Sequence, residues 1–176
     1  ILYRAEPKRH AETGSLLSPE DIETLEAFLE DDGGYYGKRV RWIEQFVEAG
    51  AAAGRGSKKQ ARRDVKLSLY YGLACNNVGE YSYYYRGQAW MKDAEENAKG
   101  SGVWYYRYAV GLLYSGYPEE ALRYAEQGVL EEADYPWTYL LLGKLRAHFG
   151  DKEGARAAAE EGLKLVPGDY EFLTLK

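Results

Sequence analysis

The sequence predicts an all-α fold of repeated helix pairs, chiefly because a set of small residues recurs at one fixed offset along the chain. The set and its later counterpart are Gly116, Ala121, Ala125 and Gly128, then Gly150, Ala155, Ala159 and Gly162. Aromatic residues open both stretches, at Trp104-Tyr105 and at Trp137-Thr138-Tyr139. Small residues at this spacing mark where neighbouring helices approach closely, and a period in the thirties is typical of a helix–turn–helix solenoid.

The N-terminal part predicts an irregular segment, residues 1–17, followed by a helical hairpin, residues 18–53. Ser18 is a suitable N-cap, Pro19 fits the first turn, and the acidic residues that follow suit the positive end of the helix dipole. The first helix is expected to end at residues 31–34, and the second to run from about 38 to 53. We expect this hairpin to be a degenerate repeat or a cap on the stack.

A basic linker at residues 54–60 separates the hairpin from the repeats, which we place at residues 61–176. Their expected ranges are 65–101, 102–135 and 136–169, and a further helix starts within 170–176. The helices expected in these ranges run over about 61–77, 81–98, 103–115, 118–131, 136–149 and 152–165. Gly79 sits where Gly116 and Gly150 sit in the later repeats, although the interval from Gly79 to Gly116 is slightly longer than the next one.

Landmark residues of the last two repeats carry a resemblance to a known family. They are Tyr139, Leu142, Gly143, Ala155, Gly162 and Pro167 in the last repeat, and Tyr105, Tyr108, Ala109, Ala121 and Gly128 in the one before. On these residues the chain resembles the tetratricopeptide repeat (TPR) family. Ala125 and Ala159 depart from it, because the family usually has a large aromatic residue there. The resemblance implies an α-solenoid in which antiparallel helix pairs form a right-handed superhelix.

The resemblance also implies a function, which is a non-catalytic scaffold that binds a peptide or partner helix in the concave groove formed by the first helix of each repeat. The groove residues carried over are Lys66, Leu69, Leu73, Asn76, Asn77, Val103, Tyr106, Val110, Leu113, Tyr114, Trp137, Leu140, Lys144 and His148. Asn side chains can pair with an extended peptide backbone, but Asn76 and Asn77 are equally suited to ending a helix before Gly79. The paired cations with which the family clamps acidic tails are incomplete, since only Lys66 and Lys144 match in character.

Tyrosine is the compositional outlier, with 18 of the 176 residues. Helical repeats use aromatic side chains as spacers, so most of these tyrosines are expected in the core. Consecutive tyrosines on a helix differ by about 100° in direction, however, so some must face solvent or the groove. They are candidate contact surfaces for a peptide, or for stacking sugars in an alternative, carbohydrate-binding function.

Catalysis and metal binding find little support in the sequence. Cys75 lies mid-helix among apolar residues, so a buried small hydrophobe is a better interpretation than a nucleophile with His148 as its base. His10 and His148 form no paired motif and there is no second Cys, so no metal-ligand spacing is present. We therefore expect a protein that is not an enzyme and holds no cofactor.

Charge and composition limit the classes of partner and the location of the protein. A net charge of −5 argues against nucleic-acid binding by the chain as a whole. The basic run at residues 55–66 is either a solvated linker or a contact for phosphate or an acidic partner. A single Cys fits a reducing, cytoplasmic location, and no apolar run reaches the roughly 18–20 residues of a transmembrane helix.

The ends of the chain suggest a larger context. The sequence starts without Met and stops shortly after what would be the start of another repeat, so we expect a fragment of a longer protein. Exposed repeat ends would allow a homo-oligomer. An alternative function follows, in which the repeats are a regulatory or substrate-recruiting segment of a larger enzyme or signalling protein.

Overall fold

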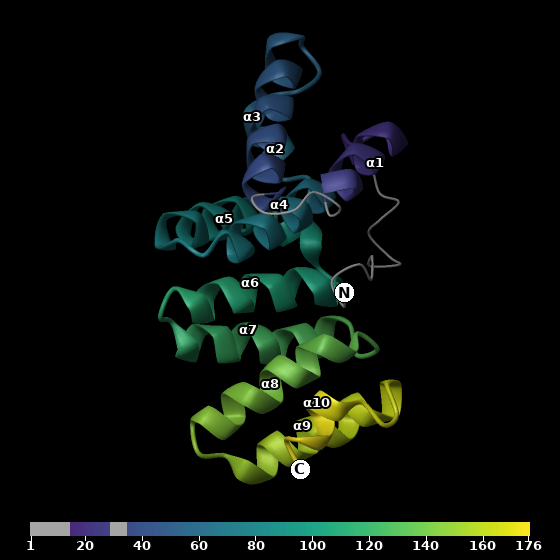
Figure 1. Ribbon diagram of the computed structural model, residues 1–176, viewed down its shortest axis with the longest axis vertical. Helices are drawn as coiled ribbons and strands as arrows, with labels where there is room; N and C mark the ends of the chain where they lie inside the picture. Colours follow the sequence, from purple (N-terminus) through teal and green to yellow (C-terminus); the bar gives the residue numbers. More distant parts are fainter. Residues whose placement is uncertain (1–14, 29–34) are drawn as a thin grey trace. The chain divides into compact units, whose positions relative to one another are not determined.

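The computed structural model describes residues 15–28 and 35–176, and the regular structure in these residues is helical throughout, as predicted (Figure 1). The described residues divide into two compact units. The N-terminal unit comprises residues 15–28 and 35–99, and the C-terminal unit comprises residues 100–176. Residues 1–14 of the irregular segment predicted at 1–17, and the helix end predicted at residues 31–34, lie outside the described residues.

The N-terminal unit begins with the predicted hairpin. Ser18 caps its first helix as expected, because the Ser18 hydroxyl accepts the Asp21 N–H (3.1 Å) and the Asp21 carboxylate accepts the Ser18 N–H (2.9 Å). Such a reciprocal capping box satisfies two backbone donors that the helix itself leaves open. The helical elements of this unit are α1 (Pro19–Ala27), α2 (Tyr35–Ala52), α3 (Lys58–Arg62), α4 (Val65–Val78), α5 (Tyr81–Asp93) and the 3₁₀ helix η3 (Glu95–Ala98).

The core of the N-terminal unit lies between α1, α2 and α4. It is formed by buried apolar side chains, which include Leu25, Val40, Ile43, Leu67 and Ala74. Two polar contacts fix α1 against its neighbours: the buried Arg39 guanidinium donates to the Leu25 carbonyl (2.9 Å), and the Tyr70 hydroxyl donates to Glu26 (2.7 Å). The predicted cap-like hairpin is therefore packed on the first repeat through a continuous core.

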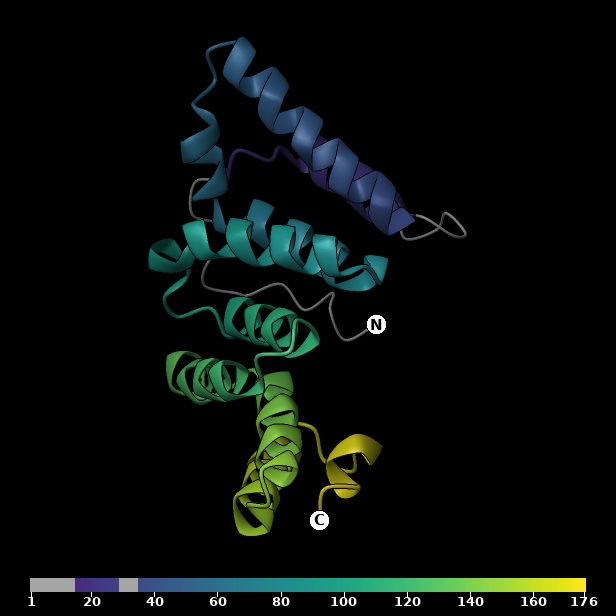
Figure 2. The same cartoon turned by 90° about the vertical axis from the view of Figure 1, so that its left-hand side faces the viewer.

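Residues 54–60 differ from the prediction, because their C-terminal part forms α3 and is not a plain linker. The physical reason is a second capping box: the Ser57 hydroxyl accepts the Gln60 N–H (3.1 Å), and the Gln60 side chain accepts the Ser57 N–H (2.8 Å). The helix predicted from residue 61 consequently starts at Val65, where Asp64 caps it by accepting the Leu67 N–H (3.1 Å). Figure 2 shows α2 inclined away from α4 and α5, with α3 bridging the wide end of the wedge.

The long helix expected over 81–98 is also interrupted. The α-helical part, α5, ends at Asp93, and the chain tightens into η3 before the loop that leads to residue 102. This 3₁₀ turn accounts for the longer first repeat, whose turn glycine, Gly79, has the same left-handed backbone as its later equivalents (φ 86°).

The helix pairs of the C-terminal unit recur at one fixed spacing along the chain. Its helices are α6 (Gly102–Tyr114), α7 (Pro118–Glu131), α8 (Pro136–His148), α9 (Lys152–Leu165) and the short α10 (Tyr170–Leu173). The first helices, α6, α8 and α10, start at one constant interval along the chain, and the second helices, α7 and α9, are separated by the same interval. Helices α7 and α9 have the bounds predicted from the sequence.

The predicted equivalence of the turns at Gly116 and Gly150 is confirmed. Both glycines adopt a left-handed conformation, with φ of 88° and 86°. The backbone hydrogen bonds around them match, because the N–H of residue 117 donates to the carbonyl of residue 112 (2.9 Å) and that of residue 151 to residue 146 (2.8 Å). A left-handed residue directly after a helix is a position that glycine fills without steric cost.

Close helix contacts also recur where small residues were predicted. Ala121 and Ala155 are buried, and a Cβ atom on Gly128 would lie only 2.7 Å from the Tyr105 Cβ. A Cβ on Gly162 would overlap the ring of Phe172, which is fully buried and stacks on Trp137 with ring centroids 6.0 Å apart. The α10 helix thus packs on α8 and α9.

Candidate functional site

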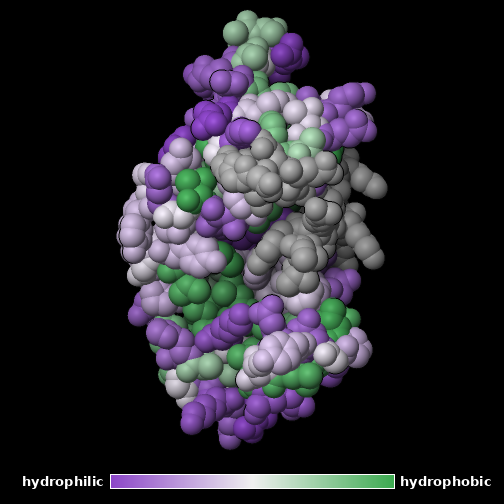
Figure 3. Space-filling model, viewed as in Figure 1, coloured by the Kyte–Doolittle hydropathy of each residue, from purple (hydrophilic) through white to green (hydrophobic). Residues whose placement is uncertain are grey.

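The aromatic and aliphatic side chains of the predicted groove reach the surface in a stripe on α6. Tyr106, Val110, Leu113 and Tyr114 are spaced so that they share one side of this helix. Tyr114 is 48% exposed, and the other three are half-buried. These four residues are called the α6 stripe below. In the view of Figure 3, apolar residues interrupt the hydrophilic surface at the level of α6 and α7.

Two of the equivalent positions on α8 are polar and exposed. Counted from the start of each helix, Leu140, Lys144 and His148 occupy the positions that Tyr106, Val110 and Tyr114 occupy on α6, and Lys144 and His148 are exposed. The Lys144 ammonium contacts the Glu171 carboxylate at 3.1 Å, with both side chains about half exposed. The C-terminal unit therefore places aromatic and aliphatic side chains on one first helix and cationic or titratable ones on the next.

Leu140 and two further predicted groove residues of this unit lie in its core. Val103 is fully buried, Leu140 is 6% exposed, and Trp137 is 8% exposed because its ring is covered by Phe172. In the conformation described, these side chains support the surface from below and offer little area to a ligand.

The predicted groove residues on α4 belong to the N-terminal unit. Leu69, Leu73 and Asn76 are buried, Lys66 is half-buried, and Asn77 is exposed. The Asn77 side-chain amide donates to the Leu73 carbonyl at 2.8 Å. This bond lies within the last turn of α4, whose left-handed C-cap is Gly79, so the Asn77 amide is engaged with its own helix.

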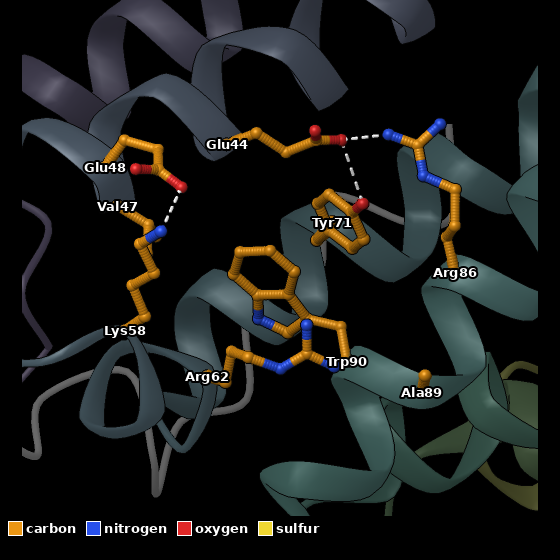
Figure 4. A pocket seen from close by; sticks show the side chains of 9 residues that line it. All are labelled: Glu44, Val47, Glu48, Lys58, Arg62, Tyr71, Arg86, Ala89 and Trp90. Carbon is orange, nitrogen blue, oxygen red and sulfur yellow. Dashed lines mark hydrogen bonds and ion pairs between the residues drawn. The ribbon is translucent and has the colours of Figure 1, made fainter.

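A pocket in the N-terminal unit was not foreseen from the sequence. It has a volume of about 330 Å³ and lies in the wedge bounded by α2, α3, α4 and α5. Tyr71 and Trp90 form its floor, where their rings stack with centroids 4.1 Å apart. The lining residues, drawn in Figure 4, are Glu44, Val47, Glu48, Lys58, Arg62, Tyr71, Arg86, Ala89 and Trp90.

Charged side chains pair across the rim of this pocket. The Glu44 carboxylate accepts a hydrogen bond from the Tyr71 hydroxyl (3.0 Å) and forms an ion pair with Arg86 (Figure 4). Glu48, one helical turn further along α2, pairs with Lys58 of α3. Burial raises the pKa of the Tyr71 phenol, and the Glu44 charge acts in the same direction, so this hydroxyl stays a hydrogen-bond donor.

Helix α3 is held to α5 as well as to α2. The Arg62 guanidinium contacts the Asp93 carboxylate at 2.6 Å and lies 5.0 Å from the centre of the Trp90 ring. The Asn97 side chain donates to the Arg63 carbonyl (3.0 Å). Apart from the buried Ala61, α3 is therefore attached mainly through polar contacts at the surface.

Cys75 lies on α4, one helical turn after Tyr71, and is fully buried, as the sequence predicted for a small hydrophobe. Burial raises the pKa of the Cys75 thiol from 9.0 to about 12, so the thiolate is scarce at neutral pH. A neutral thiol in an apolar core is a weak nucleophile.

Comparison of the chain with protein-family models, with curated proteins and with solved structures finds no match. Within residues 15–28 and 35–176, no cluster of three His, Cys, Asp or Glu side chains is placed to hold a metal ion. In the same residues, no helix is both long and apolar enough to cross a membrane.

Proposed function

We propose that this chain is a non-catalytic interaction scaffold of the TPR type, in which stacked helix pairs follow a right-handed superhelix and a first-helix face binds a peptide or partner helix. The observation that carries the proposal is the α6 stripe. The positions of the stripe on α6 have equivalents on α8, counted from the start of each helix. The stripe therefore belongs to the face that the first helices of successive repeats share.

The chemistry of the α6 stripe suits a protein partner. Tyr114 presents a rigid ring that is 48% exposed, beside the half-buried Tyr106 and Val110. Aromatic rings of this kind give large contact area for little conformational entropy, and a few of them dominate most protein interfaces. A partner side chain that inserts between Tyr106 and Tyr114 would bury apolar surface on both rings.

The polar positions on α8 would orient that partner. Lys144 and His148 stand in register with Val110 and Tyr114, so an acidic group next to the apolar anchor of the partner would face them. Lys144 already contacts Glu171, but an exposed ion pair of this type contributes only about 0–1 kcal/mol. A partner carboxylate can therefore replace Glu171 at small cost.

The proposal is tested by selection from a phage-displayed random peptide library on the purified chain. The decisive comparison is between Tyr114→Ala and Tyr117→Ala. Tyr117 is a matched control because it is the same residue type, 45% exposed, and stands just beyond the turn, off the α6 stripe. Affinities of the selected peptides are then measured for both variants by fluorescence anisotropy.

We expect Tyr114→Ala to weaken the selected peptides by about 1–3 kcal/mol, which is the usual cost of truncating an interface anchor. Tyr117→Ala should leave their affinity unchanged, and the helical circular dichroism of both variants should match the parent protein. Equal losses for the two variants, or no enrichment of peptides at all, would contradict the proposal.

A further inference from the structure

The segment that connects α2 to α4 is strongly basic within an acidic chain. Residues 55–66 hold a single acidic residue, Asp64, while the whole protein carries a net charge of −5. The cationic residues of this segment are Arg55, Lys58, Lys59, Arg62, Arg63 and Lys66. Such a concentration of one charge sign attracts partners of the opposite sign.

Helix α3 divides these cations between two faces. Lys58 and Arg62, one helical turn apart, line the pocket and are paired with Glu48 and Asp93. The neighbouring positions Lys59 and Arg63 are also one turn apart and lie on the next face. Both are exposed, and neither forms an ion pair with any residue in the described part of the chain.

The pocket on the adjacent face of α3 offers apolar surface. Its floor is the Tyr71–Trp90 stack, its wall on α2 includes Val47, and its wall on α5 includes the exposed Ala89 (Figure 4). The two carboxylates on its rim are each matched by a cation, so they do not cancel the positive charge of Lys59 and Arg63.

We propose that α3 and this pocket form a docking site for an acidic peptide segment that carries one apolar anchor residue. Acidic side chains of the peptide pair with Lys59 and Arg63, and the anchor enters the pocket between Val47 and Ala89. The site lies in the N-terminal unit and is independent of the α6 stripe, so either can fail without the other.

A peptide fits this surface better than a nucleic acid does. The pocket takes an apolar side chain, which a peptide supplies and a phosphate backbone does not. Among the described residues, only two cations on the outer face of α3 are without ion pairs, fewer than the tracks of cations that hold polyphosphate chains. One apolar pocket of about 330 Å³ suits a single aliphatic or aromatic side chain and its neighbours.

The probe is a fluorescein-labelled peptide of alternating Glu and Leu, with two companions: one has Gln in place of Glu, and the other has Ser in place of Leu. A single-stranded oligonucleotide of similar charge is the polyanion control. We expect anisotropy to show binding of the Glu–Leu peptide, with weaker binding of both companions and of the oligonucleotide. Affinity should fall as salt is raised through about 0.1 M, where the screening length is about 10 Å.

The charge requirement is tested by the double variant Lys59→Gln with Arg63→Gln. The matched control is Lys152→Gln with Arg156→Gln on α9, because these residues are also exposed, one turn apart and without ion pairs in the described residues. Loss of two exposed ion pairs should weaken the Glu–Leu peptide about fivefold at low salt, and the control should not.

The pocket requirement is tested without changing any charge. Ala89→Leu places a larger side chain at the pocket wall and should weaken the same peptide about tenfold, because the anchor can no longer be buried. Ala157→Leu, at an exposed position on α9, is the control and should have no effect.

Three results would overturn the inference. The first is a failure of the Glu–Leu peptide to bind the parent protein. The second is binding of the oligonucleotide as tight as that of the peptide. The third is an affinity for the peptide that is the same in each test variant as in its control. If the oligonucleotide binds as well as the peptide and Ala89→Leu has no effect on affinity, the cations of α3 form a general polyanion contact instead.

Discussion

Replacement of Gly128 by Ala tests the repeat packing more sharply than any truncation, because it adds one methyl group where two helices meet. The new Cβ would lie 2.7 Å from the Tyr105 Cβ on α6 and 2.9 Å from the Thr138 Cγ2 on α8. The Tyr105 Cβ moves only with the backbone, and rotation of the Thr138 side chain would break the hydrogen bond from its hydroxyl to the Gly102 carbonyl. Helix α7 must therefore move outward from α6 and α8 by several tenths of an ångström.

Two opposing effects set the magnitude. Ala is better than Gly in a helix by about 1 kcal/mol, which favours the variant. Overpacking a close contact costs about 1–3 kcal/mol, and contacts with immobile atoms belong to the upper part of that range. We therefore expect Gly128→Ala to destabilise the C-terminal unit by roughly 1–2 kcal/mol.

Gly50→Ala is a control for which we expect a change in stability of the opposite sign. Gly50 lies in α2, and no atom comes within 4 Å of the Cβ that Ala would add. This substitution should stabilise the N-terminal unit by about 0.5–1 kcal/mol through helix propensity alone. Urea unfolding followed by circular dichroism measures both changes. A stabilising Gly128→Ala would refute the close contact and with it the packing of the repeats.

Other perturbations test separate parts of the structure. Ala155→Leu should cost roughly 1–3 kcal/mol by overpacking in urea unfolding, whereas the exposed Ala157→Leu should be nearly neutral; equal effects would show that the repeat register is misplaced. Asp64→Ala should cost about 1 kcal/mol or more, because the Leu67 N–H loses its cap, and unchanged stability would argue against that cap. The raised pKa of Cys75 predicts slow reaction with thiol reagents at about pH 8 in the folded protein, and rapid labelling there would contradict its burial. The same shift predicts that the Cys75 thiol contributes fully to the free energy of unfolding below about pH 9. This contribution is lost as the pH rises toward about 12, because the thiol of the unfolded chain ionises first; Cys75→Ala should reduce this alkaline loss in urea titrations.

The repeat architecture could be predicted from the sequence because its signals are local and recur. Pro118 starts α7, and the glycines at 116 and 150 fix the turns before α7 and α9. Residues that need a left-handed backbone or lack a backbone donor restrict the chain strongly. The bounds of α7 and α9 were accordingly predicted to the residue.

Helix α3 shows where the local interpretation failed although the signal was present. Ser57 and Gln60 form the Ser-x-x-Gln pattern of a capping box, but the surrounding glycines and lysines were interpreted as linker. So short a helix is not stable by itself, and the capping box is supported by the burial of Ala61 and by the ion pairs of Lys58 and Arg62.

The pocket, and the burial of several predicted groove residues, could not be predicted in the same way. Glu44, Lys58, Tyr71 and Trp90 come from four helices, and only their packing brings them together. The resemblance to the TPR family placed Trp137 among the groove residues, but its exposure depends on Phe172, which lies two helices further along the chain and covers it. Tertiary contacts of this kind leave no trace in a periodic pattern.

Hydrogen–deuterium exchange on the complex with a library-selected peptide tests most directly whether a first-helix face is the binding surface. Binding through the α6 stripe predicts slower exchange in residues 102–114, with a smaller effect in 136–148, and unchanged exchange in α7 and α9. Protection centred on α7 or α9, with none on α6, would contradict a partner bound to the first-helix face.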